Sequence, residues 1–430
     1  RWYDKIAEVL ESFGFVSCPC MPALFRHKIK KIILNVHVDD ELMAASPSDG
    51  EWVLTMLRQH FVLSAVGPGP TLQRGNGEEL LYLKKRHVFV DGGVVILPHQ
   101  KYYNNLRELF NFSSSTTAKP TPEHPNITKE DNSEPLEAAE QRIFRSALGT
   151  CLYLSHDRPD IQYAVKCLSA SMRSPTKNSL VHLKYLCRYL LGTEGYGILF
   201  PYSSLQSRCA DRLHERDNAK SLRKACVEAF TDSDWSGHAV TRASTSSGYI
   251  FVCGCLIMSF SRTQKSISMS SCESEICAAT VGAGEAILIK EVFCFVAGLE
   301  ADSEVELHLK MDSSSGRQWL HKQGIGRLKH LASRSLWLQQ QVKAKEILVS
   351  QISTLLNLSD LGTKRLSRAR RAFLMHLLPM LCMSCSGEFS HVGEQEFADY
   401  VLQKQAKAVA SRVQQQQQSN WNTPQHVRNI

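Results

Sequence analysis

The fold is decided by residues 226–234, which read Cys-Val-Glu-Ala-Phe-Thr-Asp-Ser-Asp. Mostly apolar positions are followed by two aspartates, so we expect a buried strand that ends on carboxylates. Downstream, an apolar hairpin over 248–261 turns at Gly254, and a long helix over 272–298 and an alternating strand over 305–311 follow. Further helices and a short strand near 348–352 complete the pattern. We therefore predict an α/β unit over residues 226–365.

Composition and charge set the limits for the rest of the chain. The 430 residues are 43% apolar and 21% charged, as in soluble proteins with several globular domains. Fifty Lys and Arg residues against forty-two Asp and Glu residues give a net charge of +8. This excess permits a polyanionic partner such as nucleic acid, but an ordinary basic surface would look the same.

Cysteines and apolar runs indicate where the protein resides. The fourteen cysteines are scattered through a long chain and form no short disulfide framework, so we expect reduced thiols. The longest apolar run, 372–383, contains His376 and Pro379 and falls short of the ~20 residues of a membrane span. We expect an intracellular protein, cytoplasmic or nuclear, that does not contact a membrane. Because the sequence starts at Arg1 without an initiator methionine, it is interpreted as a fragment.

Shifts in composition divide the chain further. We predict a mixed α/β region over 1–112, a mobile Ser-, Thr- and Pro-rich linker over 113–135, and a helical unit over 136–202. Residues 203–225 are interpreted as a second linker or an insertion. After the α/β unit, a basic cluster and five glutamines indicate a tail over 366–430, helical at most and partly disordered.

Two groups of acidic residues are candidates for chemistry. Asp39 and Asp40 follow an apolar strand, where an exposed turn and a metal-binding pair are equally good interpretations. The second group stands at the ends of elements in the α/β unit and comprises Asp232, Asp234, Glu275, Asp312 and Asp360. Separated carboxylates of this kind could converge on Mg²⁺ or Mn²⁺. Two such ions can activate a water and stabilise the leaving oxygen of a phosphodiester.

Several motifs carry a family resemblance over residues 1–364. His37-Val38-Asp39-Asp40 resembles a polymerase YVDD box, and Gln100-Lys101-Tyr102 resembles a QxKY element. The match is most specific over 142–200, with Arg158-Pro159-Asp160-Ile161 and Arg188-Tyr189-Leu190-Leu191-Gly192-Thr193. The segments around Asp232, Tyr249, Glu275, Asp312, Lys329-His330 and Asp360 resemble ribonuclease H elements. Together they are similar to the Pol polyprotein of copia-type retrotransposons, from the second half of the reverse transcriptase through the ribonuclease H.

The resemblance implies a fold and a set of roles. It implies a partial reverse-transcriptase palm, a helical thumb or connection segment, and a ribonuclease H-like domain with a central mixed sheet. Asp232, Glu275, Asp312 and Asp360 would bind two Mg²⁺ or Mn²⁺ ions. Glu275 is preferred to Glu273 because the residues after it match the family's helix.

The remaining roles concern the polymerase and the substrate. Asp39 would be a polymerase metal ligand, with Asp40 its neighbour. Lys177, Lys184 and Arg188 share a helical stripe and could follow a duplex backbone, as could Lys329 and His330, although a solvated surface is the alternative for both groups. Asp234 is expected to support the hairpin, and Trp235 is expected to pack internally, with stacking on nucleic acid as the alternative.

Departures from the family pattern qualify the expected activity. The first polymerase aspartate belongs to a motif upstream of Arg1, and His37 replaces the usual tyrosine, so we expect polymerase activity to be lost. Two hypotheses follow. The first is metal-dependent cleavage of RNA in RNA–DNA hybrids, with association with the missing parts of the polyprotein. The second is a catalytically inactive remnant that binds nucleic acid.

Overall fold

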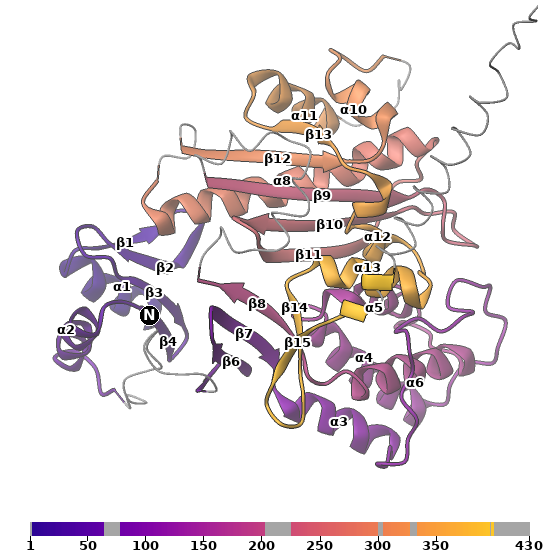
Figure 1. The fold of residues 1–430 in the computed structure, drawn as a ribbon, viewed down its shortest axis with the longest axis horizontal. Coiled ribbons are helices and arrows are strands. Elements are labelled where there is room, and N and C mark those ends of the chain that lie inside the picture. The colour runs from indigo at the N-terminus through magenta and orange to yellow at the C-terminus, as the bar shows by residue number, and fades with distance from the viewer. Residues whose placement is uncertain are drawn as a thin grey trace, which may run out of the picture.

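The computed structural model describes residues 2–63, 78–202, 225–299, 304–326, 333–395 and 397–399. Within these residues, helices and strands are mixed along the whole chain, and the strands form three sheets (Figure 1). None of the helices in these ranges is long and apolar enough to cross a bilayer. The α/β class predicted from the sequence is confirmed.

The α/β unit predicted over 226–365 contains a five-stranded mixed sheet. Its strands are β9 (Ala225–Asp234), β10 (Thr245–Val252), β11 (Cys255–Thr263), β12 (Val305–Met311) and β13 (Leu348–Gln351). They lie in the order β11-β10-β9-β12-β13. β9 pairs antiparallel with β10 and parallel with β12, so the strand quoted above is central to the sheet, with β12 beside it. This is the mixed sheet that the ribonuclease H resemblance implies.

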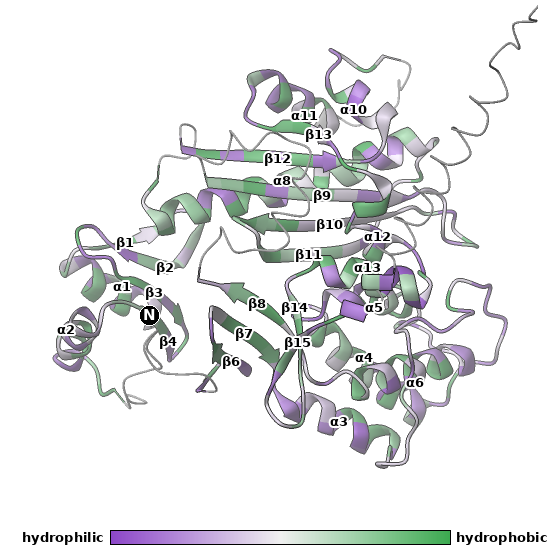
Figure 2. Ribbon diagram, viewed as in Figure 1, coloured by the Kyte–Doolittle hydropathy of each residue, from purple (hydrophilic) through white to green (hydrophobic). Residues whose placement is uncertain are grey.

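Both faces of this sheet are covered because both sets of alternating side chains are apolar. Val227 and Ala229 pack with α8 (Ser271–Ala297), α10 (Ser314–Leu320) and α11 (Ser333–Ala344). Phe230 packs on the other face, in a core that includes residues of α12 (Asp360–Thr363) and α13 (Arg368–Leu377). In Figure 2 hydrophobic colouring runs along β10, β11 and much of α8, where these cores lie.

Two glycines allow the helices to approach the sheet closely. A Cβ at Gly282 of α8 would lie 2.4 Å from the Thr231 side chain, and one at Gly362 of α12 would lie 2.2 Å from Ser247 Oγ. Both distances are shorter than any tolerable contact. The two helices therefore lie against β9 and β10 at a depth that only glycine permits, and this brings their acidic residues toward the end of β9.

The helical unit predicted over 136–202 has its own core. It contains α4 (Ala138–Leu154), a 3₁₀ turn η1 (Pro159–Ile161), α5 (Gln162–Ser169) and α6 (Lys177–Leu191), joined by α3 (Gln100–Phe110) from upstream. Gly192 caps the end of α6, as its position in the sequence indicates. The unit touches the five-stranded sheet through Gln162, whose Nε2 donates to the carbonyl oxygen of Ser259 at 2.8 Å.

The N-terminal region differs from the single unit expected over 1–112. A four-stranded sheet of β1 (Phe15–Cys18), β2 (Met21–His27), β3 (Ile33–His37) and β4 (Asp40–Ala44) forms a separate core with α1 (Trp2–Ser12) and α2 (Pro47–Arg58). The next strands are β5 (Glu79–Tyr82), β6 (Lys85–Val90) and β7 (Gly93–Pro98), and they belong to another sheet. The reason is long-range pairing, because β7 pairs with β8 (Tyr196–Pro201).

The segment predicted as a tail from 366 onward is ordered as far as residue 399, apart from residue 396, which lies outside the described ranges. After α13 it adds β14 (Met380–Met383) and β15 (Phe389–His391), so the third sheet has the order β15-β14-β8-β7-β6-β5. β14 pairs antiparallel with β8, and Met380 is fully buried. The apolar run that is too short for a membrane span is therefore a buried helix and strand. Residues 400–430, with the glutamines, lie outside the described ranges.

The linker predicted over 113–135 contains no helix or strand, but it is bound to its surroundings. Glu123 is fully buried and pairs with Arg371 of α13. The carbonyl oxygen of Thr117 accepts a hydrogen bond from Arg188 at 2.7 Å, and Glu134 pairs with Lys177. Polar side chains thus hold the segment against α6 and α13. The other linker, 203–225, lies outside the described residues except for Ala225.

Candidate active site

Three of the predicted acidic residues meet at one end of the five-stranded sheet. Asp232 lies near the end of β9, Asp312 directly follows β12, and Glu275 is in the second turn of α8. Carboxylate oxygens of all three lie within 4.8 Å of one another. Parallel neighbours end at the same edge of a sheet, which explains why Asp232 and Asp312 meet although they are far apart in the sequence. α8 then brings Glu275 to the same place.

Burial and mutual repulsion disfavour the charged forms of this cluster. Burial raises the pKa of Asp232, and Asp360 and Asp312 raise it further, while Lys364 and a hydrogen bond from Thr363 oppose the rise. Burial also raises the pKa of Glu275, with added repulsion from Asp232 and Asp312 and opposing hydrogen bonds from Ser233. Without a cation, the ionised cluster is therefore energetically costly.

The donor set fits a divalent cation with a preference for oxygen ligands. Asp232, Glu275 and Asp312 offer only carboxylate oxygens, the ligands of Mg²⁺ and Mn²⁺. Glu275 Oε2 is buried and has no hydrogen-bond partner among the described residues. A buried charged oxygen without a partner is unfavourable unless an ion satisfies it. The three residues could therefore hold a metal ion.

The neighbouring glutamate has a different position. Glu273 Oε2 accepts the backbone N–H of Met269 at 2.7 Å, and the Glu273 backbone N–H donates to the Ser270 cap of α8 at 3.2 Å. Glu273 therefore closes the start of the helix and Glu275 faces the cluster. The side chain of Ser270 caps the start of this helix.

The fourth predicted carboxylate, Asp360, lies beside the cluster and is paired with cations of the chain itself. Its Oδ1 is 2.5 Å from Lys364 Nζ, and its Oδ2 is 3.1 Å from Arg370 Nη2. Thr363 Oγ1 donates to Asp232 Oδ2 at 2.6 Å. Sequence reasoning missed Lys364, Thr363 and Arg370. The available signal was the spacing of Asp360 and Lys364, since residues four apart share one face of a helix.

Two buried polar residues fix α12 on the central strand. Ser359 Oγ donates to the carbonyl oxygen of Phe230 at 2.8 Å, and Asn357 Nδ2 donates to that of Thr231 at 3.2 Å. Both side chains are fully buried. They place Asp360 next to Asp232 even though this helix is only four residues long.

The other predicted pair, Asp39 and Asp40, lies elsewhere in the fold. Both residues are exposed at the turn between β3 and β4, where Val38 has a φ of 56° and its carbonyl oxygen accepts a hydrogen bond from the Trp2 indole. Among the described residues, no third acidic or histidine ligand gathers with them. The structure thus shows the exposed turn that was one of the two interpretations.

Comparison with known proteins gives named relatives. Over 378 residues the chain is 28% identical to the retrovirus-related Pol polyprotein from transposon RE1 of Arabidopsis thaliana. This match covers 85% of this chain and 23% of that protein. The chain is 26% identical over 399 residues to the one from transposon TNT 1-94 of Nicotiana tabacum, covering 88% and 27% respectively. Over most of its length the chain is therefore similar to retrovirus-related Pol polyproteins of plant transposons. It spans about a quarter of the length of these relatives.

The other comparisons give less. No family model matches the chain. Among solved structures, the N-terminal RNase H domain of a Mycobacterium tuberculosis protein, solved as a fusion with maltose-binding protein, matches with a TM-score of 0.23 and 14% identity. The match covers 32% of this chain and 91% of the other.

Three of the basic residues proposed for nucleic-acid contact have partners within the chain. Lys177 pairs with Glu134, Lys184 Nζ lies 5.6 Å from the centre of the Phe110 ring, and Arg188 donates to the 113–135 segment. All three therefore contribute to holding that segment or α3 against α6. Lys329 and His330 lie outside the described residues.

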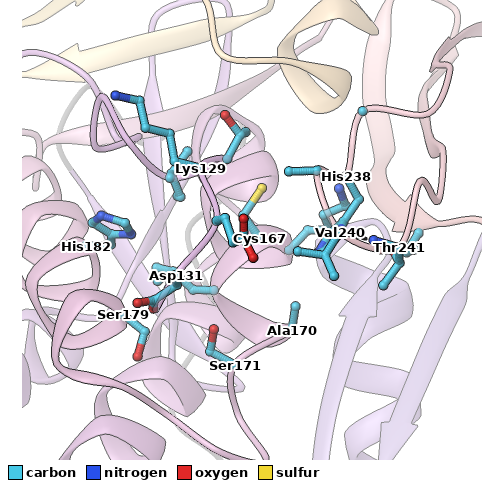
Figure 3. A pocket seen from close by; sticks show the side chains of 18 of the residues that line it. Lys129, Asp131, Cys167, Ala170, Ser171, Ser179, His182, His238, Val240 and Thr241 are labelled. Atoms are coloured by element: carbon cyan, nitrogen blue, oxygen red, sulfur yellow. Dashed lines mark hydrogen bonds between the residues drawn. The ribbon is translucent and has the colours of Figure 1, made fainter. Parts of the chain in front are cut away.

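A cavity of about 440 Å³ is lined by residues of α5, of the loop after β9 and of the segment 127–132 (Figure 3). His182, Cys167 and Val240 line it, together with Asp234. Asp234 stands opposite Thr245 in the β9–β10 ladder, consistent with the expected support of the hairpin.

Trp235 differs from the sequence-based expectation of internal packing. Its side chain is 49% exposed, and its indole N–H donates to the carbonyl oxygen of Ser268 at 2.9 Å. The hydrogen bond fixes the ring on the surface, three residues after Asp232.

Proposed function

We propose that residues 225–364 cleave the RNA strand of RNA–DNA hybrids with the help of Mg²⁺ or Mn²⁺. The observation that carries the proposal is the meeting of Asp232, Glu275 and Asp312 within 4.8 Å at the end of a central strand. The similarity to retrovirus-related Pol polyproteins supports the choice of a nucleic acid as substrate.

Each acidic residue has a role in this proposal. Asp232, Glu275 and Asp312 would hold the cation through their carboxylates, and Asp360 would be the fourth ligand in the two-ion form of the reaction. A bound divalent ion supplies Lewis-acid activation of the attacking water and stabilisation of the leaving oxygen. Thr363 fixes the orientation of Asp232 through its hydrogen bond. The Asn357 and Ser359 contacts keep Asp360 at the site.

The substrate would be held mainly through its backbone. Ribonucleases of this kind recognise the shape and the phosphates of a hybrid, with little dependence on base sequence. The exposed indole of Trp235 is a suitable flat contact next to Asp232. Lys329 and His330 remain candidate phosphate contacts.

We further propose that residues 1–202 correspond to the later part of the reverse transcriptase, with Asp39 and Asp40 as its YVDD-box aspartates. Primer extension would require a further carboxylate to complete a two-ion site. Among the described residues none gathers with this pair.

A catalytically inactive, nucleic-acid-binding protein is the second candidate. The observation in its favour is that both oxygens of Asp360 are already paired with Lys364 and Arg370. Both candidate proteins would bind the hybrid, and only the first would cleave it.

The test uses the purified full chain and a hybrid whose RNA strand is labelled at one end. We expect Mg²⁺ or Mn²⁺ to support internal cleavage of this RNA, and chelation to abolish it. The same RNA as a single strand and a matched DNA duplex are controls that should stay intact. Binding of the hybrid without cleavage under any divalent ion would favour the second candidate.

A further inference from the structure

The acidic cluster contains a positive charge that belongs to the protein. Lys364 Nζ lies 2.5 Å from Asp360 Oδ1 and 3.9 Å from Asp232 Oδ2. Its ammonium group therefore bridges the fourth carboxylate and the central one. This is the position in which a second divalent ion would have to satisfy both residues.

The second oxygen of Asp360 is occupied in a different way. Arg370 Nη2 lies 3.1 Å from Asp360 Oδ2, and the same guanidinium donates to the carbonyl oxygens of Leu355 and Thr354 at 2.6 and 2.8 Å. These extra contacts anchor Arg370. Asp360 accordingly has a cation at each oxygen, and it stands outside the group of three whose ligand atoms lie within 4.8 Å.

We propose that Lys364 serves as the resident second cation of this site, so that the chain binds one divalent ion and admits another only when the lysine leaves. This inference rests on the proposed metal-dependent function. The single ion binds to Asp232, Glu275 and Asp312, where Glu275 Oε2 lacks a hydrogen-bond partner among the described residues. The ammonium group neutralises part of the repulsion between Asp232 and Asp360.

The two cations differ in how readily they can leave. The Lys364 side chain is 47% exposed and the Arg370 side chain is 22% exposed. A lysine is a compact point charge on a flexible stem, whereas the planar guanidinium of Arg370 is held at several points. Lys364 can therefore move into solvent without disturbing the backbone, and a high divalent-ion concentration should displace it.

The test is calorimetric titration of the metal-free full chain with Mn²⁺, comparing the natural protein with Lys364→Met. We expect one ion per chain in the natural protein at moderate Mn²⁺ and two in Lys364→Met, with the second ion bound at least roughly tenfold more tightly than in the natural protein. Lys364→Arg keeps the charge and should bind one. Lys343→Met, which removes an exposed lysine of α11, is the matched control and should also bind one.

Folding of each variant is checked by circular dichroism, and Lys364→Gln replaces Lys364→Met if the latter does not fold. The combination Lys364→Met with Asp360→Asn should return the stoichiometry to one. The inference would be overturned if the natural protein bound two ions. It would also be overturned if Lys364→Met and Lys364→Gln each bound one ion with unchanged affinity. Either result would leave the proposed function standing. An absence of binding to every variant would overturn both.

Discussion

The buried pair of Arg371 and Glu123 allows a quantitative test of how the chain is held together. Arg371 Nη2 donates to Glu123 Oε1 at 2.5 Å and its Nη1 donates to the carbonyl oxygen of Asp160 at 2.9 Å. Side-chain exposure is 3% for Arg371 and 0% for Glu123. Burial raises the pKa of Glu123, and the contact with Arg371 opposes that rise. The carboxylate thus depends on this arginine for its charge.

Replacing Arg371 with Met keeps most of the aliphatic volume and removes the charge. Breaking one side of a buried ion pair costs roughly 3–5 kcal/mol, because the remaining group is left uncompensated or must take up a proton. The loss should appear in α13 and in the segment that contains Glu123. Hydrogen exchange of their backbone amides should become roughly 10²–10⁴-fold faster.

Two further variants complete this test. Arg365→Met removes an exposed charge nearby and should change the opening free energy by less than about 0.5 kcal/mol. The double variant Arg371→Met with Glu123→Leu should recover most of the loss, since both buried charges are gone. A cost below about 1 kcal/mol for Arg371→Met alone, or an equal cost in the double variant, would refute the reasoning.

Three other predictions concern pH, salt and the substrate surface. Burial lowers the pKa of His182 to about 4 from an unfolded value of 6.5, so the unfolded chain binds this proton more tightly and stability falls as pH drops through that window. His182→Gln should flatten the dependence of the free energy of unfolding on pH between 4 and 6.5, as measured by urea titration. Neutralising Lys177, Lys184 and Arg188 together should leave the salt dependence of hybrid affinity unchanged, because each side chain already contacts another part of the chain. If the slope of log affinity against log salt concentration became shallower by about 2–3, the three residues would be assigned to hybrid binding. Trp235→Ala should weaken hybrid binding by roughly 1 kcal/mol in fluorescence anisotropy, and equal affinity would remove the indole from the interface.

The elements of the central unit could be predicted because their signals are local. The β10–β11 hairpin around Gly254 and the 27-residue helix α8 follow from periodicity and turn residues within one stretch of sequence. The convergence of Asp232, Glu275 and Asp312 required the resemblance as well. Nothing in the spacing of three distant carboxylates determines that they meet.

The features that sequence reasoning missed depend on partners far away in the chain. β14 forms a strand because its backbone pairs with that of β8. The 113–135 segment is held in place because Glu123 forms a buried ion pair with Arg371. Neither partner can be identified from a local pattern. Trp235 was misjudged by the general tendency of tryptophan to be buried, since its indole N–H is satisfied at the surface by Ser268.

Hybrid cleavage by paired aspartate variants tests the central claim most directly. The unaltered 430-residue chain, Asp232→Asn and the matched control Asp39→Asn are compared in Mg²⁺, with hybrid binding measured on the same samples. We predict that Asp232→Asn loses cleavage and keeps most of its hybrid affinity, because it removes one carboxylate of the cluster, while Asp39→Asn cleaves like the natural protein. Persistent cleavage by Asp232→Asn, or equal loss in both variants, would contradict the assignment of the active site to the end of β9.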